Sequence, residues 1–142
     1  MTLDIDKLKM ELRRDEGFST KPYRDSVGKL TIGVGRNIED LGLSVAEALF
    51  MLDNDVARTI KELDLQFPWW RKMSGDRQRV LANMAFNMGI TKLLGFKNTL
   101  AAMESGDYEA AATGMENSKW ATQVGVRAVR LIGMMRGKGM IV

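Results

Sequence analysis

The chain of 142 residues contains no cysteine and no histidine. Without cysteine it can form no disulfide, no zinc-thiolate site and no thiol nucleophile. Without histidine it lacks the commonest general base, the Ser-His-Asp arrangement and most transition-metal sites. Acid/base chemistry must therefore come from Asp, Glu, Lys or Tyr, and we expect neither a metal nor another cofactor.

Long apolar runs are also missing. No stretch approaches the roughly 18–20 apolar residues that a transmembrane helix needs. The N-terminal sequence MTLDIDKLKMELRRDEG is charged throughout, unlike a signal peptide. A target outside the cytoplasm would therefore require another component to release the protein. The length fits one domain or a compact pair of lobes, and nothing in the sequence indicates more than a monomer.

The net charge of +3 is compatible with an anionic partner. Nucleic acid, anionic glycan and anionic membrane all qualify. A soluble protein with a mild excess of lysine would carry the same charge, so charge alone selects no function class.

Glu16 ends a first helix that is predicted over about residues 4–16 and is stopped by a glycine. It continues the i, i+4 series of Leu8 and Leu12 and therefore projects roughly on the apolar side. Loss of water there, and the negative end of the helix dipole, favour a protonated carboxyl, which a general acid needs. Alternatively, Glu16 turns to solvent or pairs with one of the arginines that precede it.

Residues 22–35 are predicted to form a small β element with a turn at 26–28. In the segment LTIGVG, apolar residues alternate with Thr31 and two glycines, so one face is apolar and the other carries a hydroxyl without bulk. That face leaves room for a ligand, or the glycines only ease a tight bend. Thr31 could hold a water beside a carboxylate, although strand threonines are usually just β-formers.

Asp25 precedes the predicted turn, in polar surroundings that would keep its carboxylate ionised. An ionised carboxylate suits a base, or an anion that stabilises positive charge on a sugar. The alternative is an aspartate that accepts backbone N–H groups in the turn, which is common. Taken together, Glu16, Asp25 and Thr31 are the minimum equipment for acid/base cleavage of a glycosidic bond.

The rest of the chain has a helical pattern. Ser44 and Glu47 form a capping box that starts a long helix over about residues 44–64, and Pro68 marks a break. The later helices are predicted from Ser74 to a stop at Gly89, around 93–94, over 98–103, after the N-cap Asp107, and over about 126–135.

The last predicted helix alternates basic and apolar residues and resembles a basic amphipathic helix of the membrane-surface kind. Its basic residues are Arg127, Arg130, Arg136 and Lys138, and its apolar residues are Val129, Leu131, Ile132, Met134 and Met135. Such a helix could contact an anionic outer membrane. Alternatively, it packs on the core with its basic residues outward.

The segment LRRDEGFSTKPYRDSVGKLTIGVGR resembles the active-site region of phage T4-type lysozymes, the endolysins of glycoside hydrolase family 24. That family has a Glu in a D-E-G sequence, an Asp in a Y-x-D turn and a Thr in a T-I-G-x-G strand. Glu16, Asp25 and Thr31 match in type and spacing. The segments NMAFNMG, GFKNTL and SKWATQVGVRAVRL are similar to the family's C-terminal lobe, in the same order, so the resemblance covers nearly the whole chain.

The resemblance implies an α+β, mainly helical lysozyme-like fold. A small N-terminal lobe of about residues 14–45 would carry a short β-sheet, and a connecting helix of about 44–64 would lead to a helical C-terminal lobe. That lobe would span about 66–142 and pack with the first helix, residues 1–13.

The resemblance also implies a muramidase that cleaves the β-1,4 bond between N-acetylmuramic acid and N-acetylglucosamine with inversion. Glu16 would protonate the leaving oxygen, while Asp25 and Thr31 would position and activate the attacking water. Arg127 matches a family arginine near the catalytic Glu, and would orient Glu16 unless it is an ordinary surface residue. Two cleft-like matches, Asn87 and Gln123, would bind sugar N-acetyl or peptide groups, or else cap local backbone.

Two features depart from the family pattern. The family often has His after the G-x-G strand, whereas this chain has Arg36, which could pair with an acidic residue of the helical lobe. Trp69 and Trp70 occupy a variable region. Adjacent tryptophans could stack on sugars, but at least one is expected in the core.

As an endolysin, the protein would be made in the host cytoplasm and reach the cell wall through a holin-type pore, lysing the host to release phage. Its partner would be peptidoglycan glycan strands, not nucleic acid. Two other classes stay open. One is a basic helical nucleic-acid-binding protein, which would not explain the Glu/Asp/Thr set. The other is a membrane-active or peptidoglycan-binding protein without catalysis.

Overall fold

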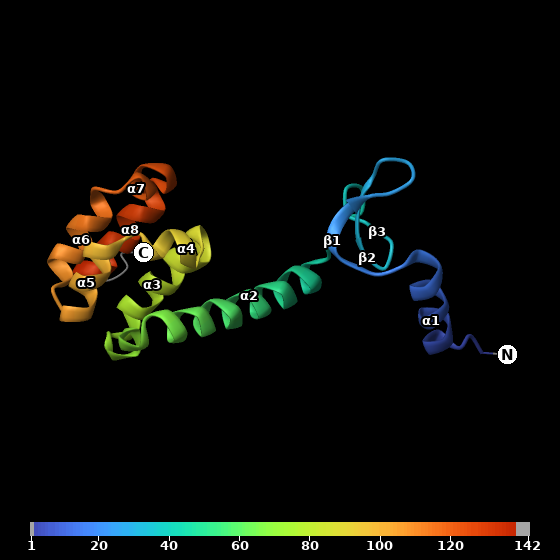
Figure 1. The fold of residues 1–142 in the computed structure, drawn as a ribbon, viewed down its shortest axis with the longest axis horizontal. Coiled ribbons are helices and arrows are strands. Elements are labelled where there is room, and N and C mark those ends of the chain that lie inside the picture. Colours follow the sequence, from blue (N-terminus) through green and yellow to red (C-terminus); the bar gives the residue numbers. More distant parts are fainter. Residues whose placement is uncertain (1, 139–142) are drawn as a thin grey trace. The chain divides into compact units, whose positions relative to one another are not determined.

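Two units, Met1–Met51 and Leu52–Val142, make up the fold, which the computed structural model describes over residues 2–138. The predicted α+β class is confirmed, since the first unit holds a three-stranded antiparallel sheet and the remainder is helical. The boundary falls inside helix α2 (Val45–Gln66), which begins in the first unit and continues into the second (Figure 1). No helix in the described range is long and apolar enough to span a bilayer.

Helix α1 (Ile5–Glu16) begins and ends where the sequence predicts. The Asp4 side chain caps it by accepting a hydrogen bond from the backbone N–H of Lys7 (3.0 Å). Gly17 ends it with φ +79°, and its N–H donates to the carbonyl of Arg13 (3.0 Å). Glu16 is therefore the last helical residue, held next to a rigidly capped helix end.

The sheet of the first unit has the strand order β1-β2-β3, with β1 Ser19–Arg24, β2 Leu30–Gly33 and β3 Arg36–Asn37. Both pairs are antiparallel, and Thr31 on the central strand lies opposite Tyr23 on one side and Asn37 on the other. The β element thus extends beyond the predicted residues 22–35 at both ends. The predicted turn at 26–28 lies between β1 and β2, as expected.

The capping box at the start of α2 is confirmed as a reciprocal pair. The N–H of Glu47 donates to Ser44 Oγ (3.1 Å), and the N–H of Ser44 donates to Glu47 Oε1 (2.8 Å). The helices that follow are η1 (a 3₁₀ helix, Pro68–Lys72), α3 (Gly75–Met88), α4 (Ile90–Leu94), α5 (Lys97–Ser105), α6 (Tyr108–Glu116), α7 (Lys119–Val124) and α8 (Val126–Arg136).

The hydrophobic core lies in the second unit, where α5 packs on α6, and α8 packs on α3, α6 and α7 (Figure 1). Its largest fully buried side chains are Leu63, Val80, Leu81, Met84, Leu93, Met103, Met115, Leu131 and Met135. Methionine is unusually common among them, and its flexible thioether side chain fills irregular gaps between short helices.

The apolar residues of α8 belong to this core. Leu131, Ile132, Met134 and Met135 are all buried. Arg136 forms ion pairs with Glu109 and Glu116 on the neighbouring helix α6. The packed arrangement is therefore the observed one for α8. The predicted C-terminal limit of the lobe, residue 142, lies outside the described residues.

Candidate functional site

Glu16 is exposed at the end of α1, and none of the residues of α1 is buried. Leu8 and Leu12 are themselves exposed, so they give Glu16 no apolar burial within the first unit, and the expected apolar surroundings stay a prediction. Pairing with a preceding arginine is not observed either. Arg14 Nε lies 3.5 Å from a carboxylate oxygen of Asp15.

The other arginine, Arg13, stacks on an aromatic ring. Its guanidinium carbon lies 4.5 Å from the centroid of the Phe18 ring. No ion pair of Glu16 is found between residues 2 and 138. The carboxyl of Glu16 thus has no charged partner among the described residues of its own unit.

Asp25 adopts the turn arrangement that the sequence leaves open as an alternative. Its Oδ1 accepts hydrogen bonds from the backbone N–H groups of Val27 (3.0 Å) and Lys29 (2.8 Å). No hydrogen bond to Oδ2 is found in the described part of the chain. One carboxylate oxygen therefore fixes the turn, and the other can accept a proton from water.

Thr31 is buried, with 3% of its surface exposed, and its Oγ1 donates to the carbonyl of Lys29 (2.9 Å). The same carbonyl accepts from the backbone N–H of Asp25 (2.9 Å). Lys29 therefore brings Asp25 and Thr31 together through its main chain, a link that no motif in the sequence indicates. Because the hydroxyl hydrogen of Thr31 is committed to Lys29, its oxygen is available only as an acceptor.

Arg36, which stands where the family often has His, forms a bidentate ion pair with Glu47. The contacts are Nη1 to Oε1 (2.7 Å) and Nη2 to Oε2 (2.5 Å), and Nη1 also donates to the carbonyl of Gly42 (3.3 Å). The predicted acidic partner exists, but it lies in the first turn of α2, within the first unit, and not in the helical lobe. The expectation of a partner in the helical lobe is therefore wrong.

The charge state of Glu47 reflects that contact. The hydrogen bond from the Arg36 guanidinium, followed by those from the backbone and side chain of Ser44, lowers the pKa of Glu47 to about 2. The same contact raises the pKa of Arg36 above its ordinary value. The pair thus ties β3 to the start of α2 with full charges at neutral pH.

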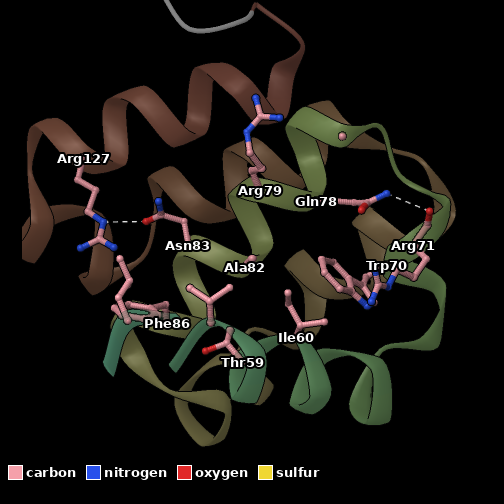
Figure 2. Close-up of a pocket in the computed structure, with 13 residues that line it drawn as sticks. Thr59, Ile60, Trp70, Arg71, Gln78, Arg79, Ala82, Asn83, Phe86 and Arg127 are labelled. Atoms are coloured by element: carbon pink, nitrogen blue, oxygen red, sulfur yellow. Dashed lines mark hydrogen bonds between the residues drawn. The ribbon is translucent and has the colours of Figure 1, made fainter. Parts of the chain in front are cut away.

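Arg127 lies in the second unit, in the first turn of α8. It is half-buried, and its Nε donates to Asn83 Oδ1 (2.8 Å) across from α3, as Figure 2 shows. Both residues line a pocket of about 500 Å³, which we call the Arg127 pocket, together with Leu52, Val56, Ile60 and Phe86. This contact fixes the Arg127 side chain beside Asn83. Its effect on Glu16 stays a prediction.

Asn87 and Gln123 meet in a second pocket of about 470 Å³, the Asn87 pocket, which also includes Lys92 and Lys119. The Trp120 indole N–H donates to Asn87 Oδ1 (2.9 Å). Asn87 therefore bonds a side chain across the pocket and does not cap local backbone, and its amide NH₂ group remains a donor. Two amides and two lysines make the lining suited to acetamido and carboxylate groups.

Of the two adjacent tryptophans, Trp70 is buried and Trp69 packs partly buried against the core, as expected. The Trp70 N–H donates to Asp64 Oδ1 (2.7 Å), and the Arg71 guanidinium lies over the Trp70 ring at 4.7 Å. The Arg71 and Trp70 hydrogen bonds lower the pKa of Asp64 to about 2. These contacts lie at the end of α2, and the face of the Trp70 ring stacks on Arg71.

The sequence matches the phage lysozyme family over residues 13–137. It is 28% identical to "Probable T4-type lysozyme 2" of Dictyostelium discoideum, over 92% of this chain and 94% of that protein. Against the "Pre-baseplate central spike protein Gp5" of Enterobacteria phage T4, identity is 32% over 84% of this chain, which spans only 26% of the spike protein. The "SAR-endolysin" of Escherichia phage Mu is 30% identical, over 78% of this chain and 63% of that protein.

Proposed function

Because this chain belongs to the phage lysozyme family, we propose that it is a muramidase, a glycoside hydrolase that cleaves the β-1,4 bond between N-acetylmuramic acid and N-acetylglucosamine in peptidoglycan. The family match over residues 13–137 carries this proposal, because that range includes Glu16, Asp25 and Thr31 at the family's spacing. The endolysin and T4-type lysozyme names of the relatives support the same substrate class.

The proposed reaction assigns one proton transfer to each carboxyl. Glu16 donates a proton to O4 of N-acetylglucosamine as the C1–O4 bond breaks. Asp25 accepts a proton from a water whose oxygen bonds to C1 of N-acetylmuramic acid. Support for the water side comes from Asp25, whose Oδ2 is free of the bonds that fix the turn, and from Thr31, whose oxygen can accept a hydrogen bond from that water.

The reaction we propose inverts the anomeric centre, as the resemblance implies. In an inverting enzyme a water must fit between the sugar and the base, whereas a retaining enzyme forms a glycosyl-enzyme bond. The test is NMR of the first product formed from a soluble peptidoglycan glycan fragment. Inversion gives the α-anomer before mutarotation, and an initial β-anomer would contradict the assignment of Asp25 as a base.

Arg127, Asn87 and Gln123 are proposed as residues that orient the acid or bind substrate. Arg127 would orient Glu16, and the bond from its Nε to Asn83 leaves both terminal nitrogens as donors. Asn87 and Gln123 would bind N-acetyl or peptide groups, which the polar lining of the Asn87 pocket supports. Changing Arg127→Lys keeps the charge but loses the planar donor set, and should lower kcat more than it raises KM.

The variant Glu16→Gln tests the proposal directly. Gln keeps the size of the side chain but cannot donate the proton, so clearing of purified cell walls should fall by about 10²–10⁴-fold. Mass analysis of the parent's products separates the classes. A muramidase leaves reducing muramic acid ends, a transglycosylase leaves anhydro ends lighter by one water, and an amidase leaves glycan strands intact. If Glu16→Gln clears walls as fast as the parent, the muramidase mechanism is wrong.

We further propose that the protein acts as an endolysin, synthesised in the host cytoplasm and reaching the wall through a holin-type pore. Expression in a bacterial host should then leave cells intact until the inner membrane is permeabilised, for example by a co-expressed holin or by chloroform. Lysis that begins on expression alone, without either treatment, would contradict this route.

A further inference from the structure

Gly35 lies directly against the side chain of Glu16. A Cβ atom added to Gly35 would be 2.7 Å from Oε2, 3.0 Å from Cβ and 3.1 Å from Cδ of Glu16. The carboxyl and the stem of Glu16 therefore run along the bare Cα of Gly35. Any residue other than glycine would place a methyl or larger group where the Glu16 carboxyl now lies.

The backbone around Gly35 forms the tight connection between two strands. Ile32 on β2 pairs with Arg36 on β3, so Gly33, the last residue of β2, leads into the turn of Val34 and Gly35. Gly33 and Gly35 both have positive φ, +70° and +65°. A Cβ added to Gly33, however, would meet no atom within 4 Å. The two glycines share a conformational requirement, but only Gly35 has a neighbour to accommodate.

The contacts of the residue that follows Gly35 hold the loop in place. Arg36, which follows Gly35, is tied by its bidentate pair to Glu47 and by its hydrogen bond to the carbonyl of Gly42. When two groups are placed too close together, the group held by fewer contacts moves away. Here one partner is a hydrogen-bonded and ion-paired hairpin, and the other is the end of an exposed, flexible glutamate. The Glu16 carboxyl would therefore move when Gly35 gains a side chain.

We propose that Gly35 is a positioning residue for Glu16: its missing side chain leaves the space that sets where the catalytic carboxyl is held. This inference rests on the proposed function of Glu16 as general acid. Gly35 itself touches no reacting atom. It acts through the position of Glu16. The ion pair of Arg36 and Glu47 supports this role by fixing the hairpin.

The kinetic consequence follows from what a general acid does. Glu16 transfers its proton as the bond breaks. Its displacement therefore reduces the stabilisation of the transition state more than it reduces the affinity for substrate. A misplacement of about 1 Å can cost on the order of 10²-fold in rate. Gly35→Ala should therefore lower kcat by about that factor on soluble peptidoglycan glycan fragments, while KM changes little.

The matched control is Gly33→Ala. Both alanines must adopt a positive φ, so both should lower stability against urea by similar amounts. Only Gly35→Ala adds a methyl against Glu16. We expect Gly33→Ala to keep kcat close to that of the parent when both variants are assayed at a temperature where circular dichroism shows each to be folded.

A second arm asks whether the effect passes through Glu16. In a Glu16→Asp background the side chain is one methylene shorter, so the 2.7 Å contact of the added methyl with Oε2 is lost and the 3.0 Å contact with Cβ remains. The further loss caused by Gly35→Ala should therefore be much smaller than in the parent. An undiminished loss in that background would overturn the proposal, and so would equal kcat for Gly35→Ala and Gly33→Ala. If instead the proposed function of Glu16 is wrong, Glu16→Gln retains activity, and this result distinguishes the two failures.

Discussion

Lys29 shows how much the site depends on residues that carry no chemistry of their own. Its backbone N–H binds Asp25 Oδ1, and its carbonyl accepts from both Asp25 and Thr31. The turn role of Asp25 and its proposed role toward water are therefore compatible, because they use different oxygens. Asn83 and Trp120 are similar cases, since each fixes a proposed site residue through one hydrogen bond.

We predict that Asp25→Asn separates the two roles of Asp25. Asn keeps Oδ1 as an acceptor for the N–H groups of Val27 and Lys29, but cannot take a proton from water. Stability against urea should stay near that of the parent, while wall clearing falls by about 10²–10⁴-fold. Asp25→Ala should lose both stability and activity. Parent-like activity of Asp25→Asn would remove Asp25 from the mechanism.

The ion pair of Arg36 and Glu47 predicts a pH dependence of stability. The pKa of Glu47 is lowered in the folded state from an ordinary value of 4.5 to about 2. A carboxyl with a lowered folded-state pKa stabilises the fold above its unfolded-state value, and this contribution is lost as pH falls through the folded-state value. Glu47→Gln should therefore be less stable than the parent above about pH 4.5, and the difference should vanish toward pH 2.

Urea unfolding of the parent and of Glu47→Gln at a series of pH values measures this difference. Gln at position 47 can still accept from the N–H of Ser44, so the capping box survives and only the charge is removed. The pair is partly exposed, so screening by solvent keeps the effect modest. Glu104→Gln on α5, at an exposed residue, is the matched control. A difference that is independent of pH would contradict the prediction.

At the scale of secondary structure, local signals located most helix ends. Asp107 and the Ser44 capping box cap helices as predicted, and Asp4 and Ser74, predicted as helix starts, are N-caps as well. The sequence pattern does not predict helix α7, because Trp120 is its one buried residue and no periodic apolar stripe marks it. Strand β3 is not predicted either, since it has two residues and is defined by its pairing with β2.

Helix α8 has the sequence of an amphipathic membrane-surface helix, yet its apolar side chains lie in the core. We therefore predict that the folded chain releases no dye from anionic vesicles at micromolar concentration. A peptide of residues 118–142, of which 139–142 lie outside the described residues, should release dye weakly, because its apolar residues are free. Release by the folded chain equal to that of the peptide would show that α8 leaves the core. No release by the peptide would end the membrane hypothesis.

At the scale of the whole molecule, the proposed site residues belong to two units. Glu16, Asp25 and Thr31 lie in Met1–Met51, whereas Arg127, Asn87 and Gln123 lie in Leu52–Val142. The proposed function therefore needs both units. The packing of the first helix with the C-terminal lobe, which the resemblance implies, stays a prediction.

That packing can be tested with the natural tryptophans. Trp69, Trp70 and Trp120 all lie in the second unit, so tryptophan fluorescence reports the unfolding of that unit alone. If α1 packs on it, Leu8→Asp and Leu12→Asp should each lower the fluorescence-monitored free energy of unfolding by about 1–3 kcal/mol. Met10 lies on the opposite side of the helix by spacing, so Met10→Asp is the matched control. Equal effects of all three changes would contradict the packing.

Features that depend on neighbours along the chain can be predicted from the amino-acid sequence alone. Helix caps join residues three apart, and the absence of cysteine and histidine leaves carboxyls as the main acid/base groups. The candidates Glu16, Asp25 and Thr31 could therefore be identified from local motifs and family spacing.

Contacts between residues far apart in the sequence are seen only in the folded chain. Three hydrogen-bonded pairs are examples: Arg36 with Glu47, 11 residues apart, Trp120 with Asn87, 33 residues apart, and Arg127 with Asn83, 44 residues apart. The contact of Gly35 with Glu16 and the burial of the apolar face of α8 are of the same kind. Such contacts depend on how whole elements pack, and the free energy of that packing is summed over the core, so no short motif encodes it.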